Sequence, residues 1–291
     1  MFQQILMWLL RSAIVGVGYV LSLTIIGAVF SALGIRFANT NQSSDFLFWQ
    51  LLAGIVIGLV LGPLAERIVA TRLRHLIIWT CVIFFNIVSV MIEGTFFAPE
   101  RMGGNLPALV VQQFILAFVT AALVTFLFAR QETTPLVLPA RAWYDWLWRF
   151  IVSALSYLVF YFIFGATNYA LVTKPYYETH AGGLVTPAVD IVLTAETIRA
   201  VLIVLSVLPF LLTITKPRRE RVIWTGILLF TIGGIVPLLF QVGALPAFLL
   251  VASAVEIFFQ NFSTGVVTAL LLGRTAAHSA LRNEKDQTAR A

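Results

Sequence analysis

The stretch PALVVQQFILAFVTAALVTFLFA, residues 107–129, carries no charged side chain and decides the class of fold. A helix needs about 20 mostly apolar residues to cross a bilayer core that is about 30 Å thick. An open sheet could not satisfy its backbone hydrogen bonds in lipid. We therefore predict a transmembrane helix over residues 107–129.

Seven further segments of this kind lie on either side of residues 107–129. They are 12–34, 46–65, 75–97, 149–171, 197–215, 222–241 and 247–273. The chain of 291 residues is 60% hydrophobic and 11% charged, against about 45–50% and about 25% in soluble domains. Its mean hydropathy of +0.95 excludes a soluble enzyme, a disordered protein and a nucleic-acid-binding domain. The sequence predicts an all-α polytopic membrane protein with eight transmembrane helices.

The basic residues predict the orientation of these helices. One side of the eight-helix arrangement collects fifteen of them: Arg11, Arg67, Arg72, Arg74, Arg130, Arg141, Arg149, Lys216, Arg218, Arg219, Arg221, Arg274, Arg282, Lys285 and Arg290. The other side has four, Arg36, Arg101, Lys174 and Arg199. Because cytoplasmic loops carry an excess of Lys and Arg, we predict a multi-pass cell-membrane protein with both termini, including a polar tail over 275–291, in the cytoplasm. The net charge of +6 is then a topology signal, and no nucleic-acid partner is expected.

The densest basic run is Lys216-Pro-Arg218-Arg219-Glu-Arg221. Such a run can anchor anionic lipid head groups, and it can also serve only to fix the positive-inside topology. Membrane lipids are the partners that the sequence predicts, with other membrane subunits or further copies of the chain as additional candidates.

The residues needed for common cofactor and hydrolase chemistry are scarce. One cysteine, Cys81, excludes a disulfide scaffold and a cysteine-based metal site. His75, His180 and His278 lie at or near segment ends, which argues against a haem protein and against histidine-based hydrolysis. We expect no cofactor and no metal, and we do not expect an enzyme.

The chain repeats itself. Trp8-Leu-Leu-Arg11 and Tyr19 match Trp146-Leu-Trp-Arg149 and Tyr157 at an offset of 138, and Gln112-Gln113-Phe114 matches Gln260-Asn261-Phe262 at an offset of 148. We predict two tandem four-helix repeats, 1–135 and 136–274. Four spans per repeat make the repeats parallel, related by an axis along the membrane normal. Chance resemblance between apolar segments is the alternative. Parallel repeats occur in transporters, where the site often lies between the halves, and also in structural subunits and membrane enzymes.

Polar side chains inside the predicted spans are the candidate functional residues, because a charge in the hydrocarbon is costly. Three adjacent stripes hold them: Asn86 and Glu93; Gln112 and Gln113; Glu256, Gln260 and Asn261. One interpretation is a polar cavity between the halves, in which Glu93 and Glu256 exchange protons. The other is interhelical hydrogen bonding with a purely structural role.

Small residues such as Gly16, Gly54 and Gly58 predict close helix contacts.

The longest loop lies between the fifth and sixth predicted spans. It contains an apolar stretch over residues 184–194, broken only by Thr186 and Asp190. We expect this stretch to lie in the membrane interface as a short helix.

The last predicted span, Glu256-Ile-Phe-Phe-Gln-Asn261-Phe262-Ser-Thr-Gly265, resembles the final span of an uncharacterised group of bacterial multi-pass membrane proteins. That group shows Glu, then Asn-Phe, then Gly at this spacing, over roughly a tenth of the chain. A His commonly precedes the Glu there, whereas Ala252 and Ser253 stand at the candidate positions here. The resemblance implies a bacterial inner-membrane location and no particular chemistry.

Two functions follow from these observations. The first is transporter-like carriage of a small molecule or lipid through the polar cavity. The second is a non-catalytic accessory subunit of a larger membrane complex, which the short loops and the lack of a soluble domain favour.

Overall fold

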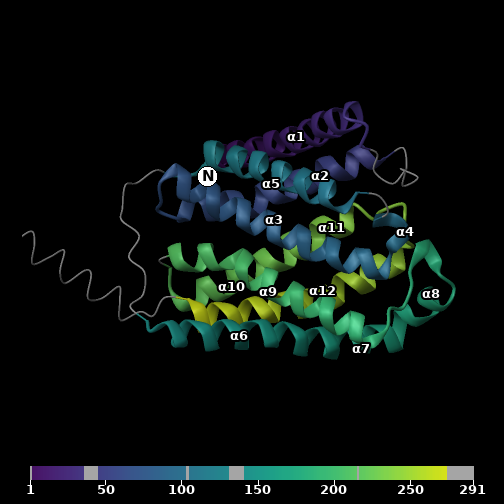
Figure 1. Ribbon diagram of the computed structural model, residues 1–291. Helices are drawn as coiled ribbons and strands as arrows, with labels where there is room; N and C mark the ends of the chain where they lie inside the picture. Colours follow the sequence, from purple (N-terminus) through teal and green to yellow (C-terminus); the bar gives the residue numbers. More distant parts are fainter. Residues whose placement is uncertain (1, 36–44, 103–104, 131–140, 215, 274–291) are drawn as a thin grey trace, which may run out of the picture.

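The computed structural model describes residues 2–35, 45–102, 105–130, 141–214 and 216–273 (Figure 1). Within these ranges the structure is helical and contains no β-strand. Eight helices are long and apolar enough to cross a membrane. For the described residues, the predictions of an all-α fold and of eight helices with the length and hydropathy of membrane spans are therefore confirmed.

Among the described residues, six of the spans are single helices, and α12, given below, is the last of them. The first five follow in chain order. They are α1 (Phe2–Ala32), α2 (Phe46–Arg67), α3 (Arg72–Phe97), α5 (Leu106–Phe128) and α9 (Val189–Thr213). The span Trp143–Glu178 is composite: α6 (Trp143–Phe160), η1 (Tyr161–Gly165), α7 (Ala166–Asn168), η2 (Tyr169–Thr173) and α8 (Lys174–Glu178). The span Arg218–Leu239 comprises α10 (Arg218–Phe230), η4 (Thr231–Ile235) and α11 (Val236–Leu239). The last span is α12 (Ala247–Leu272), and α4 (Pro99–Met102) and η3 (Ala181–Gly183) are short connecting turns.

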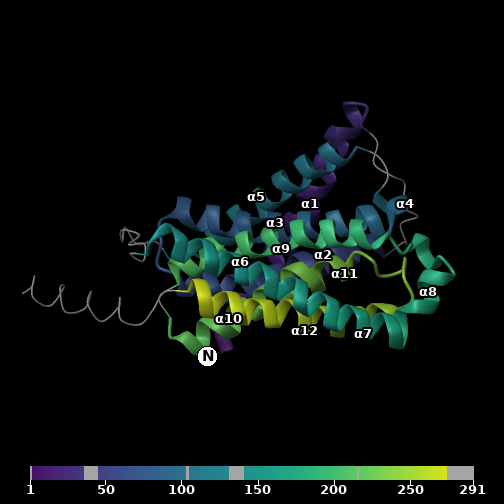
Figure 2. The ribbon, with the colours of Figure 1, turned by 60° about the horizontal axis from the view of Figure 1, so that its bottom comes forward.

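The helices form a bundle in which α3 and α9 meet in the middle. α1 packs along α2 and α5, and α12 packs along α10 and α6. The extensive contact between α3 and α9 joins these two groups, which lie on opposite sides of the bundle (Figures 1 and 2). We call the end where α2 and α5 end and α3 begins the basic end. α4 and α8 lie at the opposite end (Figure 1).

Glycines bring neighbouring helices into backbone contact. A Cβ atom placed on Gly54 of α2 would lie 2.8 Å from Cα of Gly16 in α1, and one on Gly58 would lie 2.8 Å from Cα of Ser12. α12 and α10 meet in the same way, because a Cβ on Gly265 would lie 2.7 Å from Cα of Gly226. The close contacts predicted at Gly16, Gly54 and Gly58 are confirmed.

The sixth span begins earlier than predicted. α9 starts at Val189, so residues 189–196, about the first third of the helix, were assigned to the preceding loop. The interfacial helix expected over residues 184–194 is therefore wrong, because Val189–Thr194 form the first turns of α9. Glu196 and Arg199 lower the local hydropathy, which placed the predicted boundary after Glu196 instead of before it.

Candidate functional site

Four ionisable side chains from three helices meet inside the bundle, and we call them the ion cluster: Glu93 (α3), Tyr157 (α6), and Glu196 and Arg199 (α9). Arg199 Nη2 lies 2.7 Å from Glu93 Oε2, and its Nη1 donates to both Glu196 oxygens at 2.8 and 2.7 Å. The Tyr157 hydroxyl donates to Glu196 Oε2 at 3.0 Å. The Arg199 guanidinium also lies over the Tyr157 ring, 5.7 Å from its centroid. One arginine thus joins the carboxylates of α3 and α9.

The ion cluster lies well inside the helices. At a rise of about 1.5 Å per residue, Arg199 is about 15 Å along α9 from Val189. Glu196 is 0% and Arg199 is 5% exposed, while the side chain of Glu93 keeps 35% of its surface. Buried charges of this kind are tolerated when they are paired and hydrogen-bonded. The partial exposure of Glu93 leaves one side of the cluster open.

Of the ion cluster, only Glu93 is a site residue predicted from the sequence. Arg199 fell inside the sixth predicted span, 197–215, but was counted only among the basic residues of the non-cytoplasmic side, and Glu196 was not considered. The signal was present, since Glu196 and Arg199 are three residues apart and therefore adjacent on a helix. The apolar residues on both sides, such as Leu193 and Ile203, indicate that the helix continues through them.

Glu256 of α12 lies beside the composite span. Its Oε2 accepts a hydrogen bond from Asn168 Nδ2 of α7. Its Oε1 lies 3.1 Å from the position that a Cβ on Gly165 would occupy. Glu256 also interacts electrostatically with the ion-cluster members Glu93 and Arg199. The sequence-predicted pair Glu93 and Glu256 thus belongs to one electrostatic neighbourhood.

Asn86 and Asn261 meet at the π-helical turn η4. A Cβ on Gly233 of η4 would lie 2.7 Å from Asn86 Oδ1 and 3.1 Å from Asn261 Nδ2. Asn86 donates to Ser206 Oγ of α9 at 2.9 Å, and Asn261 donates to the Leu229 carbonyl at 3.2 Å. Single π-helical turns are frequent at functional sites. Here the missing side chain of Gly233 makes room for both amides.

The predicted glutamines occupy separate places. Gln112 and Gln113 lie on α5, which packs on α1, α2 and α3, whereas Gln260 lies on α12 among α6, α9 and α10. Gln112 and Gln260 are buried, at 7% and 3% exposure. Gln113 Oε1 and Gln260 Nε2 are buried without a hydrogen-bond partner among the described residues. The structure brings Glu93 near Glu256 and Asn86 near Asn261, and it leaves Gln112 and Gln113 on the other side of the bundle.

The basic run at the start of α10 is divided. Arg218 and Arg219 are exposed and Lys216 is partly exposed. Arg221 is 7% exposed, and its Nε lies against Gly273 at the end of α12. Arg221 therefore faces into the protein, and three of the four predicted head-group residues remain accessible.

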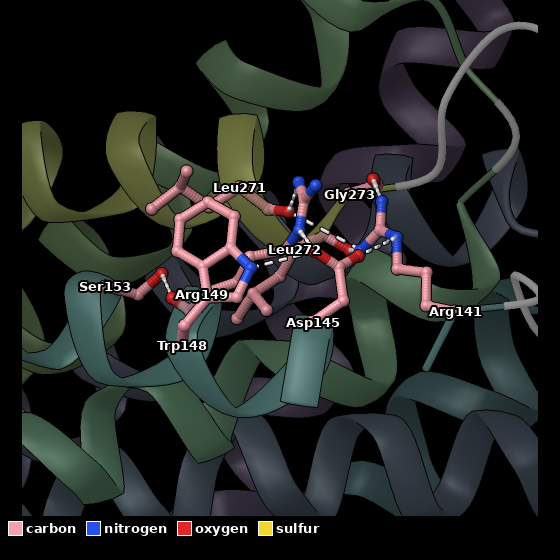
Figure 3. A network of polar contacts seen from close by, with 8 residues as sticks. All are labelled: Arg141, Asp145, Trp148, Arg149, Ser153, Leu271, Leu272 and Gly273. Atoms are coloured by element: carbon pink, nitrogen blue, oxygen red, sulfur yellow. Dashed lines mark hydrogen bonds and ion pairs between the residues drawn. The ribbon is translucent and has the colours of Figure 1, made fainter. Parts of the chain in front are cut away.

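Two further arginines bind the end of α12 (Figure 3). Arg141 donates to the Gly273 carbonyl at 2.9 Å, and Arg149 donates to the Leu271 carbonyl at 3.0 Å. Asp145 holds Arg149 through a 3.0 Å ion pair. Burial lowers the pKa of Arg141 from its ordinary value, Arg149 lowers it further, and Asp145 acts in the opposite direction. These contacts satisfy carbonyls that a helix end leaves without partners.

Comparison with known proteins adds no identification: no family model, curated protein or solved structure matches the chain. Among the described residues, no group of three His, Cys, Asp or Glu side chains is arranged to hold a metal ion. The carboxylates of the site can bind cationic groups and exchange protons.

Proposed function

We propose that this membrane protein is a carrier that moves a small molecule or a lipid through a polar site between its two four-helix halves. The observation that carries the proposal is the ion cluster, in which Glu196 and Arg199 are buried within a helix that is long and apolar enough to span a membrane. Ionisable residues inside membranes are costly and mark substrate, ion or proton pathways. The 35% exposure of the Glu93 side chain supplies access to this site.

The charges of the site favour coupling to protons. Glu93, Glu196 and Glu256 face a single cation, Arg199, so two negative charges are in excess when all four are ionised. Glu93 and Glu196 are both paired with Arg199, whereas the hydrogen-bond partner of Glu256 is the neutral Asn168. Glu256 is therefore the carboxylate that we propose to bind and release a proton during transport.

We further propose that residues 1–135 and 136–274 are tandem parallel repeats. Residues that match in sequence are buried in both halves, which supports the proposal: Tyr19 and Tyr157, Gln112 and Gln260, Thr120 and Thr268. The ion cluster combines Glu93 of the first half with three residues of the second. Sites between repeated halves are typical of transporters.

The charge distribution supports an orientation. We propose that the basic end faces the cytoplasm of a bacterial cell, with both chain termini on that side. The accessible Lys216, Arg218 and Arg219 would then contact lipid head groups. The ion cluster would lie in the half of the membrane that faces away from the cytoplasm.

Uptake into membrane vesicles tests the carrier. Vesicles from cells that express the protein or Glu256→Gln are incubated with a metabolite and lipid extract under an imposed pH gradient, and accumulated solutes are measured by mass spectrometry. We expect at least one solute to accumulate with the unchanged protein and not with Glu256→Gln. Glu220→Gln, an exposed carboxylate in the first turn of α10, is the matched control and should transport normally. Identical solute profiles for the unchanged protein and Glu256→Gln would contradict the proposal.

A second candidate function is that of a non-catalytic accessory subunit. One observation favours it: of the residues in α6, only Ser153 and Tyr157 are buried, so that most of this helix faces outward. Purification in mild detergent followed by mass spectrometry tests it. Stoichiometric membrane partners that are lost when Leu155 and Val159 on the exposed face are changed to Trp would support the subunit; a protein that purifies alone supports the carrier.

A further inference from the structure

The basic end contains a second polar site, unconnected with the ion cluster. A cavity of 860 Å³ lies between the first turns of α1, the ends of α2 and α5, and the start of α10. Its lining includes three arginines, one carboxylate and two indole rings: Arg11, Arg67, Arg130, Glu66, Trp8 and Trp224. The cavity thus combines positive charge with aromatic surface.

The arginines are oriented by their neighbours. The Arg67 guanidinium lies over the Trp224 ring at 4.9 Å, which fixes its plane at the cavity wall. Arg11 lies 5.9 Å from the Phe128 ring centroid and pairs with Glu66 at 3.6 Å. That ion pair is weak, because both side chains keep more than a third of their surface, 38% and 39%. Three guanidinium groups against one carboxylate leave an excess of two positive charges for a ligand.

The cavity also has an apolar wall. Arg11 is level with Glu66 near the end of α2, so the first turns of α1 extend about 13 Å beyond α2 at about 1.5 Å per residue. Ile5 and Met7 of this extension line the cavity, and each is 48% exposed. A ligand that fits this surface has an anionic group for the arginines and an apolar part for α1.

We propose that this cavity binds an anionic phospholipid, with its phosphate on Arg11, Arg67 and Arg130 and an acyl chain along the first turns of α1. Arginine is well suited to phosphate because its planar guanidinium donates two parallel hydrogen bonds. In the orientation proposed above, the basic end lies among the head groups of the cytoplasmic leaflet, where such a lipid is present at high local concentration. The site is separate from the exposed run at residues 216–219.

Native mass spectrometry of the full-length protein in mild detergent tests the site. The protein is titrated with dioleoylphosphatidylglycerol, with dioleoylphosphatidylcholine, and with inorganic phosphate as a competitor. We expect one tightly bound phosphatidylglycerol, weaker phosphatidylcholine and no displacement by phosphate. Equal retention of the two lipids would overturn the proposal, and so would displacement by phosphate at millimolar concentration, because the ligand would then be a free anion.

Matched variants locate the lipid. Arg67→Gln with Arg130→Gln should weaken phosphatidylglycerol binding by about tenfold or more, since charge-assisted hydrogen bonds are lost. Glu66→Gln should instead tighten binding, because it removes the carboxylate that competes for Arg11. Arg218→Gln with Arg219→Gln removes the same charge from the same end outside the cavity and should leave the tight lipid in place. Equal loss in this control, or weaker binding in Glu66→Gln, would show that the cavity is not the site.

Discussion

The contact between α1 and α2 differs in chemistry from the contact between α6 and α9, although the repeat hypothesis makes the two pairs equivalent. α1 and α2 meet through Gly16, Gly54 and Ser12, close enough for backbone contact. α6 and α9 meet through the Tyr157 hydroxyl and the Glu196 carboxylate, 3.0 Å apart. A pair of helices joined by glycines has little room to change, whereas a pair joined by ionisable side chains responds to protons and ligands. The difference shows that the helix pairs matched by the repeat hypothesis are held together by unlike contacts, close backbone packing in one and buried ionisable side chains in the other.

The largest expected effect comes from removing Arg199, the only cation of the ion cluster that lies between α6 and α9. Arg199→Leu leaves Glu196 buried without its partner, and breaking a buried ion pair in this way costs about 3–5 kcal/mol. Thermal unfolding can be followed through the labelling of Cys81, the single cysteine, by a thiol-reactive dye. Adding Glu196→Gln to Arg199→Leu should recover part of the lost stability. If Arg199→Leu alone is as stable as the unchanged protein, buried ion pairing does not distinguish the α6–α9 contact from the α1–α2 contact.

The two buried tyrosines provide a sharper test. Tyr157→Phe removes a hydrogen bond to a carboxylate and should cost about 1.5–3 kcal/mol in the free energy of unfolding. Tyr19, equally buried, lies against Phe240 with ring centroids 6.3 Å apart. Tyr19→Phe should therefore cost less than about 1 kcal/mol. Equal losses for the two variants would show that the ion cluster contributes nothing specific to α6.

The glycine contact is tested by a single methyl group. Gly54→Ala places a Cβ 2.8 Å from Cα of Gly16, so the helices must separate, at a cost of about 1–3 kcal/mol. Gly27→Ala on α1 is the control, because its Cβ meets nothing within 4 Å. We expect the unfolding temperature to fall for Gly54→Ala and to stay constant or rise for Gly27→Ala. Unchanged stability of Gly54→Ala would show that the first pair is not tightly packed.

The smallest effect is expected for an ion pair of the first half. Arg11 and Glu66 also join α1 to α2, at 3.6 Å, but both side chains are more than a third exposed. Glu66→Gln should change the free energy of unfolding by less than about 1 kcal/mol, because solvent screens such pairs. A loss as large as that of Arg199→Leu would mean that burial does not distinguish the two regions.

Hydropathy was sufficient to predict the number of spans but not the full length of each. The long apolar runs identified all eight, because nothing but a helix satisfies their backbone in lipid. Hydropathy also placed the start of the sixth span after Glu196, since charges lower the average wherever they stand. A hydropathy average does not show that the charge of Arg199 is paired with Glu196 and Glu93, because Glu93 comes from a distant part of the chain. The pairing across α3 and α9 depends on the packing of the bundle.

The same limit applies to the polar stripes. The structure places Asn86 and Asn261 of these stripes together against Gly233. The placement of residues on helix faces could not say that Gln112 and Gln113 lie on the other side of the bundle, because periodicity fixes a face and not a neighbour. Nor could it foresee η4, where a local change of winding at Gly233 admits two amide side chains.

The arginines at the end of α12 have a consequence for biogenesis. Arg141 precedes α6 and Arg149 lies within it, and their carbonyl partners belong to the end of α12, more than 120 residues later in the chain. α1 and α2 can associate once residue 67 has been translated, so the first half can assemble during synthesis. The hydrogen bonds from Arg141 and Arg149 to the end of α12 cannot all form until Gly273 has been translated. We therefore expect α1 and α2 to associate before Arg141 and Arg149 bind the end of α12.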